Sequence, residues 1–72
     1  MSGLPVISGQ KAVKAFSKLG YYYHSQHGSH VKLKHGSKPT LVIPLHDELD
    51  RGTLRALIKA AELTVDEFVE LL

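Results

Sequence analysis

The chain has 72 residues, which is long enough for one small domain, and a domain of this size buries only about 60% of the surface that its unfolded chain exposes. There is no cysteine, so disulfides, thiolate nucleophiles and cysteine-based zinc sites are excluded. Residues 1–46 contain six lysines and no acid, a charge of +6, whereas residues 47–72 contain three basic and seven acidic residues, a charge of −4. This asymmetry favours a polyanion-binding surface on the first part of the chain.

The first expected element is a helix over residues 9–19. Ser8 is a good N-cap, because its hydroxyl can accept a hydrogen bond from a free amide of the first turn. Gly20 suits the position after the helix, where a left-handed conformation is needed, and Tyr21 can then pack on Phe16. The apolar residues at helical spacing are Ala12, Val13, Phe16 and Leu19.

Three strands connected as a meander are expected after the helix. A turn at residues 27–29 returns the chain antiparallel, and Gly28 within it is expected to adopt a positive φ. A second turn precedes an apolar segment that ends at a proline. The expected strands cover residues 21–26, 30–34 and 40–44.

Side chains along a strand alternate between two faces, which predicts what each face of the sheet carries. In the second strand, Val31 and Leu33 can close a core, while His30, Lys32 and Lys34 point the other way. One face of the sheet would therefore present an imidazole and two ammonium groups in a row.

The same rule applied to the first strand separates its aromatic residues. Tyr21 and Tyr23 are expected to face the helix. Tyr22, His24 and Gln26 are then expected on the opposite face, beside the basic row.

The remaining sequence predicts two further helices. Asp50 or a neighbour caps the first of them, and Thr64 with Glu67 forms a capping box for a short last helix over residues 65–72. The result is a single α+β domain over residues 1–72, ordered α-β-β-β-α with a short extra C-terminal helix, in which the helices cover one face of a three-stranded antiparallel sheet. The apolar stripe of the longer helix consists of Leu54, Leu57, Ile58 and Ala61.

Several short motifs, in this order and spacing, make the chain resemble the HicA toxins, the mRNA-interferase half of HicA/HicB toxin-antitoxin pairs. The resemblance spans nearly the whole chain. The motifs are Leu4-Pro5 with Ser8-Gly9, Gly20-Tyr21, Gly28-Ser29-His30, Pro44 with His46, Gly52-Thr53-Leu54 and Glu67-Phe68.

This resemblance implies a fold like that of the double-stranded-RNA-binding domain (dsRBD), ribonuclease activity on mRNA, and neutralisation by a HicB-like antitoxin. The histidine of the family's Gly-Ser-His motif is catalytic, which here is His30. We expect Lys32 and Lys34 to hold the RNA phosphate, and Gly28 to let the RNA backbone approach. Ser29 could either bind a phosphate or cap the turn.

Metal-independent RNA cleavage needs a base for the 2′-OH proton and an acid for the leaving 5′-oxygen. Histidine suits either role, because its ordinary pKa of about 6.5 lies near the working pH. From the residues alone, His30 also fits an ordinary exposed strand histidine. The resemblance is what favours the catalytic interpretation.

The other histidines and one tyrosine have less definite roles. His46 fits a secondary acid role or a structural hydrogen bond, and Tyr22 fits base stacking, an exposed strand position or a contact with the antitoxin. His35 lies beside a turn and is expected to be solvated. The spacing of His24, His27 and His30 suggests a metal site, but residues 1–46 offer no carboxylate or thiolate to complete one, so we expect no metal and no cofactor.

Three classes of function stay open at this point: an mRNA-cleaving toxin, a non-catalytic RNA-binding module of the same fold, and a protein-interaction domain. We expect mRNA and a HicB-like antitoxin as partners, with no contact to a membrane and none to DNA by this chain alone. No apolar run approaches the roughly 20 residues of a membrane span, and the first residues lack the features of a signal peptide. A cytoplasmic location is therefore expected.

Overall fold

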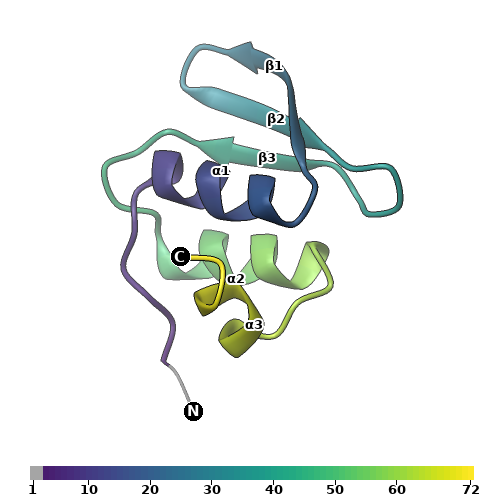
Figure 1. Ribbon diagram of the computed structural model, residues 1–72. Helices are drawn as coiled ribbons and strands as arrows, with labels where there is room; N and C mark the ends of the chain where they lie inside the picture. Colours follow the sequence, from purple (N-terminus) through teal and green to yellow (C-terminus); the bar gives the residue numbers. More distant parts are fainter. Residues whose placement is uncertain (1–2) are drawn as a thin grey trace.

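The computed structural model describes residues 3–72, and its order of elements confirms the α-β-β-β-α layout with a short third helix (Figure 1). None of the helices in this part of the chain has the length and hydropathy of a membrane-spanning segment. The elements are α1 (Gly9–Lys18), β1 (Tyr22–His27), β2 (His30–Lys34), β3 (Leu41–Pro44), α2 (Arg51–Ala60) and α3 (Val65–Val69).

Both ends of α1 are fixed by the residues that the sequence indicated. The Ser8 hydroxyl accepts a hydrogen bond from the Lys11 backbone N–H at 3.1 Å. At the other end Gly20 has a φ of 109°, and the Tyr21 N–H donates to the Phe16 carbonyl at 3.2 Å, which is the long bond of a Schellman motif. The rings of Phe16 and Tyr21 pack edge to face, with centroids 5.9 Å apart.

The sheet is antiparallel throughout, with strand order β1-β2-β3, and its apolar face lies against the helices. Val31 is paired with Ile43 and Leu33 with Leu41, and all four side chains are buried. Helices α1 and α2 pack mainly against β3, which leaves β1 as the strand farthest from them (Figure 1). Within residues 3–72, no helix or strand covers the opposite face of the sheet, as predicted (Figure 1).

A bulge in β1 changes which side chains share a face. The pairing with β2 shifts between Tyr23 and Ser25, so within residues 3–72 His24 has no partner residue across the sheet. Gln26 consequently lies opposite Val31, on the helix side, and the prediction that it faces away with Tyr22 is wrong. One inserted residue reverses the alternation of every position that follows it.

The second half of the chain completes the core on the same side of the sheet as α1 (Figure 1). Asp50 caps α2, and Thr64 and Glu67 form the predicted capping box of α3, with hydrogen bonds of 2.8 and 3.1 Å. Helix α3 ends at Val69 and is shorter than predicted. Phe68 packs against Phe16, with ring centroids 5.0 Å apart, and this contact joins the two ends of the chain.

Candidate functional site

The sheet face that lies opposite the helices carries the predicted site. His30, Lys32 and Lys34 occupy this face along β2, as the alternation predicted. We call this surface the free sheet face. Its other members, placed by register, are Tyr22, Ser25 and His27 on β1 and Val42 and Pro44 on β3.

His30 opens β2 at the edge of the hairpin turn and is exposed. Its neighbours across the sheet are His27 on one side and Pro44 on the other. Within residues 3–72, no hydrogen bond or ion pair engages its ring. The imidazole is therefore accessible to a ligand and both of its nitrogens are available.

A two-residue turn of Gly28 and Ser29 precedes His30 and is held by its neighbours. Gly28 has a φ of 59°, as predicted, and its carbonyl accepts a hydrogen bond from the Gln26 side-chain amide at 2.9 Å. The Ser29 carbonyl accepts from the Leu45 backbone N–H at 2.6 Å. The Ser29 hydroxyl has no partner among the described residues, so it is free to bind a ligand.

Main-chain contacts bring a third segment to this end of the sheet. The Gly9 N–H at the start of α1 donates to the His46 carbonyl at 2.9 Å. The backbones are so close here that a Cβ on Gly9 would lie 2.0 Å from the Pro44 carbonyl oxygen. The predicted motifs at Ser8-Gly9, Gly28-Ser29-His30 and Pro44 with His46 are thus neighbours in space, and the His46 side chain stays exposed.

Positive charge on the free sheet face comes from Lys32 and Lys34, which are half-buried. Lys32 lies between Ser25 and Val42, and Lys34 lies opposite Tyr22, whose side chain is 56% exposed. No acidic residue occurs in the first 46 positions, so no carboxylate from either neighbouring strand neutralises these lysines. The face combines an open imidazole, two cations and an exposed aromatic ring.

The histidines of β1 do not form a metal site. His24 lies in the bulge, whereas His27 is paired with His30, so the three-residue spacing does not bring all three rings together. Across residues 3–72, no group of three or more His, Asp or Glu side chains is arranged to hold a metal ion. The pairing of His27 with His30 follows from the two-residue turn, a signal that the sequence contains in Gly28-Ser29.

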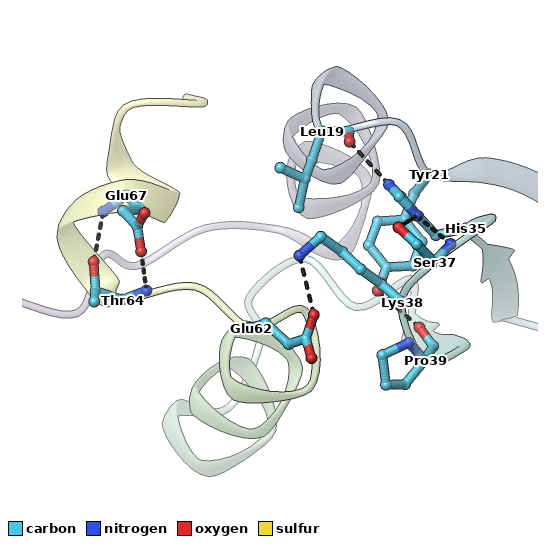
Figure 2. Close-up of polar contacts among 9 residues, drawn as sticks. All are labelled: Leu19, Tyr21, His35, Ser37, Lys38, Pro39, Glu62, Thr64 and Glu67. Atoms are coloured by element: carbon cyan, nitrogen blue, oxygen red, sulfur yellow. Dashed lines mark hydrogen bonds and ion pairs between the residues drawn. The ribbon is translucent and has the colours of Figure 1, made fainter.

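His35, at the other end of β2, is a structural residue, and the prediction that it is solvated is wrong (Figure 2). Its Nε2 lies 3.2 Å from the Leu19 carbonyl, which can only accept, so the proton is on Nε2. Its Nδ1 accepts the Ser37 backbone N–H at 3.0 Å, and its ring lies 5.0 Å from that of Tyr21. The reason is packing: the end of α1 lies directly against the β2–β3 loop.

The exposed lysines of α1 lie away from the free sheet face. Lys11, Lys14 and Lys18 border shallow hollows on the helix side of the molecule. A mainly apolar groove of about 280 Å³ lies there as well, between α1 and the overhanging β1. These features are not continuous with the basic row of β2.

Comparison with known proteins identifies the family. The model of the family described as the HicA toxin of bacterial toxin-antitoxin systems matches residues 9–63, which is more than half of the chain. The chain belongs to the HicA toxin family. The matched segment contains every residue of the free sheet face. No curated protein matches the chain. Membership assigns this HicA domain to the toxins of toxin-antitoxin systems, which act with an antitoxin partner.

Proposed function

We propose that this HicA toxin is a metal-independent endoribonuclease of mRNA and that His30 is its catalytic residue. The observation that carries the proposal is the His30 ring, which is exposed, unpartnered within the described residues, and followed along β2 by Lys32 and Lys34 on a face without acids. A histidine kept for stability would be expected to hydrogen-bond to its surroundings, as His35 does.

In this reaction, His30 removes the proton from a ribose 2′-OH, and the 2′-oxygen attacks the adjacent phosphorus. The 5′-oxygen leaves and takes up a proton, which produces a 2′,3′-cyclic phosphate and a 5′-OH end. Lys32 and Lys34 hold the phosphate, Ser29 supplies a hydroxyl and Gly28 leaves room for the RNA backbone. Proton transfer by one positioned group contributes about 10²- to 10⁴-fold, so positioning of the RNA supplies the rest.

A HicB-like antitoxin is the partner that we propose for the free sheet face. The exposed apolar side chains on this face, Tyr22 and Val42, lie next to the basic row. A protein covering both would block access to His30 and silence the enzyme sterically. In this scheme, Tyr22 and His46 are secondary contacts for either RNA or antitoxin.

The test is induced expression of the parent chain and of His30→Ala, following growth and mapping new 5′ ends in cellular mRNA. We expect growth arrest and new 5′ ends from the parent alone, and restored growth when the antitoxin is co-expressed. His24→Ala is the matched control, since His24 is also exposed but lies in the bulge, and it should behave like the parent.

The competing function is RNA binding without cleavage by the same basic face. Arrest by both the parent and His30→Ala, with no new 5′ ends, would establish that alternative. If neither protein arrested growth and both bound only the antitoxin, this protein would act as an interaction domain.

A further inference from the structure

We propose that His27 is a second catalytic residue of this site, the general acid that protonates the leaving 5′-oxygen while His30 acts as the base. This inference rests on the proposed ribonuclease function and deepens it. RNA cleavage by proton transfer needs one group that accepts a proton and another that donates one in the same event. A single imidazole is in only one of these states at a time.

The register of the hairpin pairs the two histidines directly. His27 ends β1 and His30 begins β2, with only the two-residue turn between them. Directly opposed residues of an antiparallel pair lie on the same face, with Cβ atoms about 5 Å apart. Both imidazoles therefore lie at the same corner of the free sheet face, close enough to contact one phosphodiester from two positions.

Neither imidazole forms a hydrogen bond or ion pair with another described residue. His27 is exposed, and within residues 3–72 its side chain has no hydrogen bond or ion pair. The turn below the pair is held by main-chain and glutamine contacts, namely Leu45 N–H to the Ser29 carbonyl and Gln26 to the Gly28 carbonyl. The corner is thus fixed without the use of either histidine.

The other histidines near this face are placed less favourably for the role. His24 lies in the bulge and has no partner across the sheet. His46 follows the end of β3, and the structure fixes its main chain through Gly9 rather than its ring. Among the histidines of residues 3–72, only His27 is in register with His30.

The surroundings of the pair suit an anionic reaction centre. The nearest basic residue on the free sheet face is Lys32, two positions after His30 on β2. Pro44 on β3 is uncharged, and His46 is the titratable group that follows it. No carboxylate from the first 46 residues competes with the phosphate for these donors.

The proposed step balances in protons and electron pairs. The 2′-OH proton passes to His30 as the 2′-oxygen forms a bond to phosphorus. The bond from phosphorus to the 5′-oxygen breaks, its electron pair stays on that oxygen, and the His27 imidazolium supplies the proton. Exchange with water then removes a proton from His30 and returns one to His27.

A substrate with a better leaving group tests the assignment. An RNA oligonucleotide carrying the mapped cleavage site is prepared with the normal 5′-oxygen, and a second one with a 5′-sulfur, which leaves as a thiolate without protonation. We expect His27→Ala and His27→Gln to cleave the normal linkage about 10²- to 10⁴-fold more slowly than the parent. Both should cleave the sulfur linkage at nearly the parental rate, whereas His30→Ala should be slow on both.

His24→Ala is the control and should match the parent on both linkages. Unchanged melting temperatures for the His27 variants would show that the exposed position does not affect folding. If His27→Ala cleaved the normal linkage at the parental rate, the proposal would be overturned. If His30→Ala still cleaved slowly in that case, the ribonuclease function itself would be retained. Equal losses on both linkages would also overturn the acid role, because they indicate binding or positioning.

Discussion

A histidine lies at each end of β2, His30 as its first residue and His35 just after its last, and the two ends are held by different kinds of contact. At the His30 end two bonds run between main chains, from Leu45 to Ser29 and from Gly9 to His46, and the Gln26 side chain adds one to the Gly28 carbonyl. At the His35 end, side chains make the contacts (Figure 2). Because the contacts of the His30 end do not use its histidines, these side chains stay available to bind a ligand.

This difference is consistent with the roles that we propose for the two ends. A side chain that satisfies a partly buried carbonyl, as His35 does for Leu19, cannot move away without leaving that carbonyl unpaired. A catalytic imidazole must instead exchange partners during each turnover. At the His30 end, backbone hydrogen bonds and the Gln26 side chain fix the turn, and within residues 3–72 the His30 and His27 rings are left without a partner. Substitutions at the two ends should therefore have different effects on stability and on cleavage.

The largest effect is expected from Gly9→Ala, which attacks the backbone contacts of the His30 end. The added Cβ would lie 2.0 Å from the Pro44 carbonyl oxygen and 2.9 Å from the Leu45 Cα, so main chain must move. We expect a loss of about 3 kcal/mol or more in the free energy of unfolding, together with a lower rate of RNA cleavage by the folded protein. Chemical denaturation and cleavage assays measure the two.

Gly36→Ala is the matched control, because nothing lies within 4 Å of a Cβ at that position, in the loop after His35. It should change the free energy of unfolding by no more than about 0.5 kcal/mol. A Gly9→Ala protein as stable and active as this control would show that the close backbone contact does not hold the His30 end.

A smaller effect, on stability alone, is expected from His35→Ala. The change removes the hydrogen bonds of the ring with the Leu19 carbonyl and with Ser37, and the ring contact with Tyr21, which should cost about 1–3 kcal/mol in the free energy of unfolding. Cleavage of RNA below the melting temperature should stay close to parental. His30→Ala should show the reverse, with unchanged stability and lost cleavage. Loss of cleavage by folded His35→Ala would mean that the two ends are not independent.

Local patterns in the sequence predicted most of the fold. The bounds of β2, the Ser8 cap, the turn at Gly20 and the alternation of Val31 with His30 are confirmed, because each depends on residues a few positions apart. The same alternation placed Lys32 and Lys34 beside His30, which the structure bears out.

The errors have physical causes that lie outside local patterns. Gln26 was assigned to the wrong face because the bulge at His24 has no marker such as glycine. His35 was expected in solvent because its partner Leu19 is distant in sequence and becomes a neighbour only when α1 packs on the sheet. The contacts of Gly9 with residues 44–46 could not be predicted for the same reason.

The smallest expected effect is on the stability at high pH, and it concerns Tyr21, which lies at the His35 end. Burial raises the pKa of Tyr21 above its ordinary value of 10.0, and the nearby Glu62 carboxylate adds to the shift. In the unfolded chain the phenol ionises at its ordinary pKa, so ionisation favours unfolding. The stability linked to this group is therefore complete below pH 10 and is lost as the pH rises through the higher pKa of the folded state.

Tyr21→Phe should remove that alkaline loss while lowering stability at neutral pH by about 1 kcal/mol, because the hydroxyl no longer donates to the Pro39 carbonyl, a bond of 2.7 Å. Denaturation curves from about pH 8 to pH 11 measure both effects. Tyr22→Phe is the control, since its exposed ring should leave the alkaline loss intact. Tyr21→Phe could instead show the same stability as the parent at every pH in this range. In that case the buried phenol does not hold the loop at the His35 end, and the contacts of His35 and Lys38 do.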